Sequence, residues 1–327
     1  MRSMVTGAGG MVGSHLVERL AARGDEVLGT YYKPTVDLGE IHGCGARFEE
    51  CDVRYAQHVE RLVRGFKPDV VYHLAAQSYP AVSWSHPQET LDTNAGGTVS
   101  VFEAVKAARA DDPSYDPAVV VACSSAEYGA TLDELRGGLV TENAPLKPLH
   151  PYGVSKVAQD LLAFQYSRSD GIRSVRVRIF NTTGPRKVGD APSDFVRRAV
   201  SQERAGAEYP VLRVGNLETR RALLDVRDLV SAFVLLADGA LSGSVERGDV
   251  FNVASENVYA MREVVECIER TMGVSFELRQ DSSLLRPTDE KVIAGDTSRL
   301  RSATGWRQSI AFEQTIADMV AYWRGKA

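Results

Sequence analysis

The sequence has few cysteines, no long apolar run and no excess of positive charge. Its four cysteines, Cys44, Cys51, Cys123 and Cys267, are too dispersed for a CxxC metal site and too few for a disulfide scaffold. No segment approaches the roughly 18 consecutive apolar residues of a membrane span, and strand-like sequence begins at Arg2 without a signal core. A net charge of -5 provides no global positive field for nucleic acid. We therefore expect a cytoplasmic protein with reduced thiols and with no metal, membrane or nucleic-acid partner.

The composition is that of an ordinary folded protein. The 327 residues are 44% hydrophobic and 25% charged, with 28 glycines and only 13 prolines. At roughly 100–200 residues per domain, this length suggests one large domain or two closely joined ones. Most cationic residues are arginines, which can hold a phosphate or diphosphate inside a small site. The composition therefore does not exclude small phosphorylated ligands.

Short apolar runs alternate with helix-length amphipathic stretches through the first half of the chain. This alternation predicts a doubly wound parallel α/β sheet with right-handed crossovers, a Rossmann fold. The predicted strands contain residues 3–5, 26–28, 69–72, 118–121 and 174–177, with a further strand before Asp52. The predicted helices span residues 11–23, 55–65, 89–110 and 151–169.

After about Asn181 the pattern changes to glycine- and proline-rich stretches. Later predicted elements are a helix over 227–237, a strand over 250–253, a helix over 261–272, a strand near Phe276 and a helix over 310–324. We predict a dinucleotide-binding Rossmann domain over residues 1–180, with 226–255 interleaved. A smaller C-terminal α/β substrate domain is predicted over 181–225 and 256–327.

A glycine-rich turn follows the first predicted strand. Gly7, Gly10 and Gly13 have a Gly-x-x-Gly-x-x-Gly spacing, and Met11 and Val12 open the following helix. Glycines in such a turn permit close approach of a pyrophosphate, and the helix N-terminus supplies free N–H groups. The strand-turn-helix context favours a dinucleotide cofactor over a purely structural turn.

The second predicted strand ends without the carboxylate that usually selects NAD. Lys33 stands there instead and could meet a 2′-phosphate, which favours NADP over NAD, although a solvated surface lysine is the alternative. Asp52 and Val53, after the third strand, are expected near the adenine, unless Asp52 is an ordinary loop residue.

Tyr152 and Lys156 lie four residues apart on the helix that Pro151 introduces, so they share one face. A free tyrosine titrates near 10 and needs a nearby cation to act as an acid or base at neutral pH. Ser124 ends an apolar strand, at the carboxyl edge where open α/β sheets bind ligands.

With these motifs in this order, nearly the whole sequence resembles the extended short-chain dehydrogenase/reductases, the NAD-dependent epimerase/dehydratase family. The resemblance implies a catalytic triad in which Ser124 forms a hydrogen bond with the substrate, Tyr152 transfers a proton, and Lys156 binds the cofactor ribose and lowers the pKa of the tyrosine. It also implies that both Tyr152 and Lys156 touch the cofactor. Further cofactor-facing positions implied by the resemblance are Leu74, Ala75, Ala76 and Asn94.

Within the family, the sequence is most similar to the branch of GDP-mannose 4,6-dehydratases and GDP-4-keto-6-deoxy-mannose reductases. The matching stretches are residues 148–156, 214–218, 225–228, 285–289 and 304–306. The resemblance implies a nucleotide-sugar substrate, with GDP as the expected nucleotide. The substrate contacts that it implies are Ser78, Ser125, Asn181, Arg186, Val214, Asn216, Arg221 and Arg286.

The sequence departs from the dehydratase pattern at the acid/base position. Dehydratases of this branch carry an acidic residue two places after the triad Ser/Thr, where this chain has Ala126. Glu127 is one residue later, and on an extended backbone it would point to the opposite face unless a bulge intervenes. Two other departures are Ala222, where an Asp follows the Arg, and His150, which is either an extra acid/base or a backbone cap.

Three functions follow from these observations. A nucleotide-sugar reductase or epimerase, acting by hydride transfer at C4, needs only the triad and an NAD(P) cofactor. A 4,6-dehydratase would in addition require Glu127 as its acid/base. A non-catalytic dinucleotide sensor is the third, against which the intact triad argues. By resemblance we also expect a homodimer formed through the helices that begin near Glu89 and Pro151.

Overall fold

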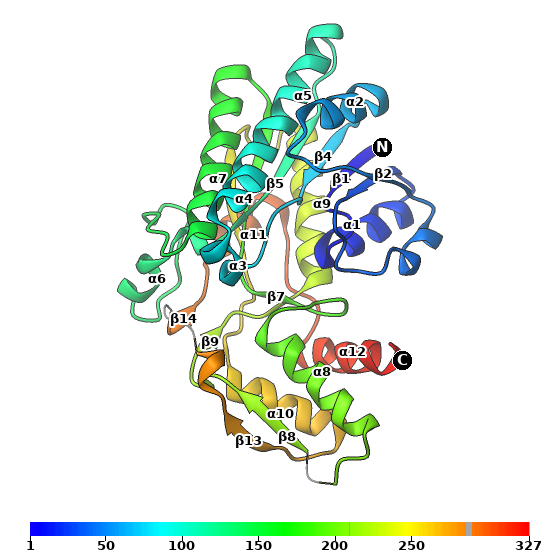
Figure 1. Cartoon of the computed structure of the whole chain (residues 1–327). Coiled ribbons are helices and arrows are strands. Elements are labelled where there is room, and N and C mark those ends of the chain that lie inside the picture. Colours follow the sequence, from blue (N-terminus) through cyan, green and yellow to red (C-terminus); the bar gives the residue numbers. More distant parts are fainter. Residues whose placement is uncertain (209, 286–289, 327) are drawn as a thin grey trace.

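The computed structural model describes residues 1–208, 210–285 and 290–326, and a parallel seven-stranded sheet forms its centre (Figure 1). The strand order is β3-β2-β1-β4-β5-β6-β11. The strands are β1 (Arg2–Thr6), β2 (Glu26–Tyr31), β3 (Arg47–Glu50), β4 (Val70–His73), β5 (Ala118–Ser124), β6 (Arg173–Ile179) and β11 (Asp249–Val253). The order reverses between β1 and β4, which creates a crevice at their carboxyl ends. The predicted doubly wound α/β fold is confirmed.

The middle strands consist of residues that tolerate burial on both faces. All seven residues of β5 and all four of β4 are buried, as parallel strands covered by helices require. The edge strand β3, with the sequence Arg-Phe-Glu-Glu, has no fully buried residue. As an edge strand it pairs only with β2, and its faces are only partly covered, so its sequence has little apolar signal.

Helices cover both faces of the sheet. On one face α1 (Met11–Ala22) and α9 (Val226–Ser242) pack over β1 and β6 in one apolar cluster. On the other face α2 (Ala56–Phe66), α5 (Gly97–Asp111) and α7 (Pro151–Asp170) form a second cluster. Figure 1 shows α5 and α7 side by side at one edge of the molecule.

The helix predicted over 89–110 is interrupted. It comprises α4 (Pro87–Leu91), a π-helical turn η3 (Asp92–Gly96) and α5. A π turn is rare and often marks a functional site. Asn94 lies inside this turn and is fully buried.

A second group of elements, at the bottom of Figure 1, has a separate apolar core. It is built from α8 (Ala191–Arg204), α10 (Met261–Met272), α12 (Phe312–Gly325) and the parallel pair β8 (Val211–Val214) and β13 (Glu277–Gln280). Strand β11 and helix α9, from the second half of the chain, join the large sheet layer instead. The domain boundaries expected from the sequence stay a prediction.

Short elements connect these two groups. The remaining helices are α3 (Pro80–Ser85), α6 (Ala130–Glu134) and α11 (Ser298–Thr304). The short strands are β7 (Thr182–Thr183), β9 (Arg220–Arg221), β10 (Leu224–Asp225), β12 (Tyr259–Ala260) and β14 (Val292–Ile293). The 3₁₀ turns are η1 (Leu38–Glu40), η2 (His42–Cys44), η4 (Ser125–Glu127) and η5 (Ser282–Leu284). Across the three described ranges, no helix combines the length and apolarity needed to cross a membrane.

Trp306 fastens the C-terminal segment to the sheet layer. Its side chain is 1% exposed, and its Nε1 donates to the Asp228 carbonyl at 3.0 Å and to Ser231 Oγ at 3.1 Å. Both partners belong to α9, whose opposite side packs on the sheet. The indole therefore fills space in the core and also satisfies a buried donor.

We expect Trp306→Ala to lower the free energy of unfolding by about 3–5 kcal/mol, because it leaves a cavity where a buried aromatic ring stood. Urea unfolding followed by circular dichroism measures this change. The matched control is Trp84→Ala, since Trp84 is 55% exposed on α3. Equal losses in the two variants would contradict the assigned packing role of Trp306.

Candidate functional site

The glycine turn after β1 forms a tight cradle. Gly7 has φ +74°, and a Cβ there would lie 2.8 Å from the Ala75 backbone nitrogen. A Cβ on Gly13 would lie 2.2 Å from the Gly7 carbonyl oxygen. Gly10 differs, because a Cβ there would meet only the Gly7 carbonyl oxygen, at 3.4 Å. Gly7 and Gly13 thus allow the backbone of the turn to pack closely against its neighbours, whereas Gly10 faces open space.

The N-terminus of α1 is suited to bind a phosphate group. Gly10 is its N-cap residue and brings no side-chain hydrogen bond, and Met11 and Val12 begin the first turn. Among the described residues, no N-cap side chain binds the first backbone N–H groups of the helix, and the helix dipole adds positive potential there. The residues present fit the pyrophosphate of a dinucleotide, as the sequence predicts.

Buried hydrogen bonds connect this cradle to the neighbouring strand. Thr6 Oγ1 accepts the backbone N–H groups of Leu74 and Ala75, each at 3.1 Å, and lies 2.9 Å from His73 Nδ1. His73 Nε2 lies 3.1 Å from Thr98 Oγ1, which itself donates to the Asn94 carbonyl. The bonds are all satisfied when His73 is neutral with its proton on Nε2. Burial agrees with this, since it lowers the pKa of His73 to about 3.

Asn94 joins the cofactor-facing loop to the helix that carries Tyr152. Its Oδ1 accepts the backbone N–H of Gln77 at 2.8 Å, which fixes the loop just after Ala76. Its Nδ2 donates to the Gln77 carbonyl at 3.0 Å and to Ser155 Oγ at 2.9 Å. Ser155 in turn donates to the Tyr152 carbonyl. Asn94 therefore lies beside the predicted cofactor segment and holds it against α7.

Ser124, Tyr152 and Lys156 come together at the carboxyl end of β5. The Ser124 side chain lies close enough to Tyr152 for hydrogen bonding between them to lower the pKa of the tyrosine. Lys156 Nζ lies 5.8 Å from the centre of the Tyr152 ring. The structure thus brings the predicted triad into one place, where strand β5 and the first two turns of α7 meet.

Burial moves the pKa values of the tyrosine and the lysine in opposite directions. It raises the pKa of Tyr152 to about 12, and the hydrogen bond with Ser124 opposes this rise. It lowers the pKa of Lys156 to about 8. Lys156 is 3% exposed, and its Nζ donates to the Ala122 carbonyl and to Gln159 Oε1, each at 2.7 Å. Tyr152 therefore holds a proton at neutral pH, beside an ammonium group that is fixed in place.

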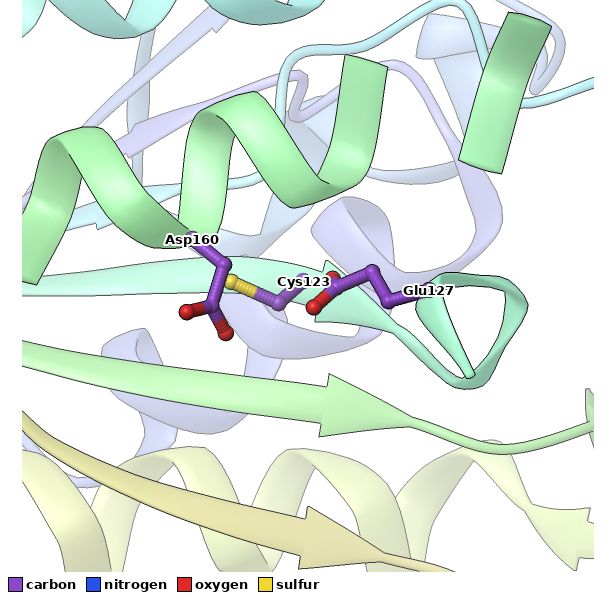
Figure 2. A group of neighbouring side chains, drawn as sticks. All are labelled: Cys123, Glu127 and Asp160. Carbon is purple, nitrogen blue, oxygen red and sulfur yellow. The ribbon is translucent and has the colours of Figure 1, made fainter. Parts of the chain in front are cut away.

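Glu127 points into the core. The backbone from Ser125 to Glu127 is the 3₁₀ turn η4, not the extended segment considered from the sequence, so the argument from strand alternation does not apply. The turn directs the carboxylate back under Ser124, where Oε1 accepts the Ser124 backbone N–H at 2.8 Å. Figure 2 shows Glu127, Cys123 and Asp160 pointing toward one another.

Two arginines neutralise this buried group. Arg178 Nε lies 3.2 Å from Glu127 Oε2 and 3.0 Å from Asp160 Oδ2. Arg176 NH1 donates to Asp160 Oδ1 at 2.6 Å. Both carboxylates are fully buried, and unpaired charges there would be costly. The two arginines already pair with the acidic side chains that would bind a cation. The group of Cys123, Glu127 and Asp160 therefore does not indicate a metal site.

His150 is the N-cap of α7. Its Nδ1 accepts the Gly153 backbone N–H at 3.0 Å, and its ring stacks on Tyr152 with centroids 5.9 Å apart. Of the two roles considered from the sequence, the capping role has a bond in the structure. Because Pro151 follows at the first helical position, this cap fixes the start of the helix that presents Tyr152 and Lys156.

The predicted adenine end contains Lys33, Asp52 and Val53. Lys33 adopts φ +46° just after β2, and its ammonium has no carboxylate partner within the described ranges. Arg54 binds Asp52 through both carboxylate oxygens and, like Lys33, lies over the Tyr32 ring. Asp52 is therefore already paired, whereas Lys33 is the available cation. Val53 packs against Gly97 at the start of α5.

Two of the predicted substrate contacts, Ser125 and Asn181, come just after the paired strand ends of β5 and β6, and Ser78 lies on a different loop. Ser125 is buried directly after Ser124, and Ser78 is exposed on the loop before α3. Asn181 follows Ile179, which pairs with Ser124 across the sheet. The Asn181 Oδ1 is buried without a hydrogen-bond partner in the described part of the chain. Such an atom is a candidate for a bond to a ligand.

The other predicted substrate contacts are distributed more widely. Arg186 has φ +70° and forms ion pairs with Glu18 of α1 at 2.8 Å and Glu40 of η1 at 3.4 Å. Val214 ends β8, and Asn216 lies in the turn that follows. Arg221 is buried in β9 and donates to the carbonyls of Arg220 and Glu290. The prediction for Arg286 falls outside the described residues. These assignments, like the triad roles, stay predictions.

Sequence reasoning missed the residues that support the site. Thr6, Thr98 and Arg178 have no distinctive motif, because their roles depend on residues far away in the sequence. Glu127 did carry a signal, since Ser124-x-x-Glu127 has the spacing of a capping box. That spacing allows Glu127 to turn back toward Ser124, and the structure shows that it does.

Comparison with known proteins gives consistent results over the whole length. The model of the family described as GDP-mannose 4,6 dehydratase matches residues 4–319. GDP-6-deoxy-D-mannose reductase of Pseudomonas aeruginosa is 28% identical over 99% of this chain and 98% of that protein. GDP-mannose 4,6 dehydratase 1 of Arabidopsis thaliana is 27% identical over 97% of this chain and 88% of its own length.

Two solved structures are similar in fold as well as sequence. RMD from Pseudomonas aeruginosa, complexed with NADPH, has a TM-score of 0.81 and 27% identity, covering 99% of both chains. The UDP-glucose 4-epimerase of Thermus thermophilus, in complex with NAD, has a TM-score of 0.86 and 28% identity, covering 100% of both chains.

We expect Gly10→Val to abolish dinucleotide binding while costing only about 1 kcal/mol of stability, because the added side chain projects into the cradle and not into the protein. Fluorescence titration with reduced cofactor and urea unfolding measure the two effects. The control Gly13→Val should unfold the protein, since its Cβ would collide with the Gly7 carbonyl oxygen. Undiminished cofactor affinity in the folded Gly10→Val variant would refute the assignment.

Proposed function

The chain belongs to the GDP-mannose 4,6-dehydratase family, and we propose that it transfers a hydride at C4 of a GDP-linked sugar, as a 4-keto-6-deoxy-sugar reductase or as an epimerase. Within this family of NAD(P)-dependent enzymes, the relatives include a reductase and dehydratases. The choice among these activities rests on the acid/base groups that surround the triad.

The observation that carries the proposal is the place of Glu127. Ala126 stands where dehydratases of this branch have their acid, and the Glu127 carboxylate is buried beneath the Ser124 backbone. A dehydration would need a carboxyl group that reaches the sugar to move protons at C5 and C6. A reduction or epimerisation at C4 needs none. The arrangement therefore supports these two reactions over dehydration, and the intact triad argues against a mere sensor.

The residues have clear roles in such a reaction. The bound nicotinamide cofactor supplies or accepts the hydride. Tyr152, protonated at neutral pH, donates a proton to the oxygen of a C4 ketone as it becomes a hydroxyl. Ser124 donates a hydrogen bond to the same oxygen, and the Lys156 ammonium stabilises the phenolate that remains. The Oδ1 of Asn181, which is buried without a hydrogen-bond partner among the described residues, is in a suitable place to accept a bond from the substrate.

NADP is the proposed preferred cofactor. Lys33 follows β2 without a carboxylate partner in the described part of the chain, and the strand ends without the acid that would bind a free ribose hydroxyl. Among the structures similar to this chain, that of the Pseudomonas protein contains NADPH and that of the Thermus epimerase contains NAD.

A homodimer in the cytoplasm completes the proposal. Val154, Leu161 and Phe164 are exposed on α7, spaced at seven and three residues so that they share one face, and Val99 is exposed on the neighbouring α5. The dispersed cysteines support a reducing compartment. Sedimentation equilibrium tests the assembly, and a monomer mass at micromolar concentration would rule the dimer out.

We expect the protein to oxidise NADPH in the presence of a GDP-linked 4-keto-6-deoxy sugar, or to convert a GDP-sugar into its C4 stereoisomer with unchanged mass. Absorbance of the reduced cofactor and mass spectrometry follow these reactions over a panel of GDP-, UDP-, CDP- and dTDP-sugars. Loss of one water from a saturated sugar without net cofactor consumption would overturn the proposal in favour of dehydration.

Tyr152→Phe should lower kcat by about 10²–10⁴-fold, because it removes the proton donor and leaves the ring in place. Cofactor affinity should be retained, since the pyrophosphate cradle is untouched. Full activity in this variant would exclude Tyr152 as the acid.

Lys33→Glu should weaken NADP binding by about 10- to 100-fold and leave NAD binding unchanged or stronger, because one charge-assisted bond to the 2′-phosphate is lost. The ratio of kcat/KM for the two reduced cofactors measures the effect. The control is Lys106→Glu on α5, whose ammonium pairs with Glu103 and Asp170. An unaltered ratio in Lys33→Glu would place the 2′-phosphate elsewhere.

A further inference from the structure

Glu127 and Ser124 hold each other in a single turn of chain. The Ser124 backbone N–H donates to Glu127 Oε1 at 2.8 Å, and Ser124 Oγ accepts the Ala126 backbone N–H at 3.2 Å. This reciprocal pair is a capping box around η4. It fixes both the peptide and the side-chain rotamer of Ser124 at the end of β5.

The bond pattern also determines how the Ser124 hydroxyl can be used. A hydroxyl has one proton to donate and lone pairs that accept. Because the Ala126 N–H already occupies an acceptor position, the Ser124 proton is free to donate toward Tyr152 or toward a substrate oxygen between them. A serine that polarises a carbonyl needs this orientation.

The surroundings keep the Glu127 side chain in place. Its second oxygen, Oε2, lies 3.2 Å from Arg178 Nε, and Arg178 is anchored by Asp160 and by its bond to the Tyr128 hydroxyl. Burial and Asp160 raise the pKa of Glu127 well above its usual value, and Arg178 and the Ser124 N–H offset only part of this rise. A proton on Oε2 would leave Oε1 able to accept the Ser124 N–H. The bond to Ser124 therefore survives in either protonation state.

We propose that Glu127 is a positioning residue, which aims the Ser124 hydroxyl at the substrate oxygen by holding the Ser124 backbone N–H from inside the core. The expected effect on kcat rests on the proposed hydride transfer at C4. The expected ordering of Ser124 does not depend on that reaction. It assigns Glu127, the acidic residue of η4, a role that involves no contact with the sugar.

Two substitutions of Glu127 separate the effect of its bond to the Ser124 N–H from the effect of its acidic group. Glu127→Gln keeps an oxygen that can accept the Ser124 N–H, and Glu127→Leu removes it at similar size. We expect the Leu variant to lose about 10- to 100-fold in kcat, the effect of displacing a catalytic group by about 1 Å, with KM for the sugar and cofactor affinity nearly unchanged. The Gln variant should recover most of kcat. Equal kcat in the wild type and the Leu variant would overturn the proposal.

A double-mutant cycle tests whether Glu127 acts through Ser124. In a Ser124→Ala background, Glu127→Leu should cause no further loss of kcat, because the hydroxyl that it positions is gone. Multiplicative losses would mean that Glu127 acts by another route. The matched control is Glu142→Leu, since Glu142 Oε1 likewise accepts a backbone N–H, that of Asn252 at 2.8 Å and not that of Ser124. It should reduce stability without lowering kcat.

Amide hydrogen exchange provides a readout that needs no turnover. The Ser124 N–H should exchange slowly in the wild type and in Glu127→Gln, and faster in Glu127→Leu, when measured by NMR on the folded full chain. If no sugar in the panel reacts but exchange follows this order, the hydride-transfer proposal fails and the positioning role stands. If sugars react but exchange at Ser124 is the same in all three proteins, the positioning role fails alone. Should the Leu variant not fold, Glu127→Ala takes its place in both measurements.

Discussion

A buried chain of hydrogen bonds is the constraint on which the site depends. It runs from Thr6 at the end of β1 through His73 and Thr98 to Asn94, and from there through Ser155 to the Tyr152 carbonyl. Polar groups buried without partners would cost several kcal/mol, so each link has little freedom to move. The chain joins the glycine cradle, the loop after β4 and the start of α7. The elements that are predicted to bind the cofactor and to transfer the proton are therefore set at one fixed spacing.

Burial determines the chemistry of the site as much as its geometry does. The same loss of water keeps Tyr152 protonated at neutral pH and makes the Lys156 ammonium easier to deprotonate. Beneath them, Arg176 and Arg178 pair with Asp160 and Glu127, so that two acidic side chains can be buried next to Tyr152. The triad thus lies above a layer of paired charged side chains, at the carboxyl edge of the sheet where ligands are expected to bind.

Much of the fold could be predicted because its signals are local. The apolar runs of β4 and β5, the glycine turn at Gly7 and the proline before Tyr152 each specify nearby backbone. The interruption of the helix at Asp92–Gly96 was not predictable, because the sequence there has an ordinary helical pattern and the π turn serves the distant partners of Asn94. The sequence predicts the start of α7 correctly. The role of His150 as its cap depends on side-chain geometry, which the sequence does not show.

The sequence by itself determined the doubly wound α/β fold, the family and the meeting of Ser124, Tyr152 and Lys156, since strand ends and a four-residue helical spacing bring them to one edge. Only the tertiary structure decided what Glu127 does. A one-residue bulge after the strand could have brought the same carboxylate to the sugar, but the 3₁₀ turn sends it under Ser124 to Arg178. The reason is that the direction of a side chain after a strand depends on which distant partners satisfy its charge, and Arg178 lies fifty-one residues away in sequence.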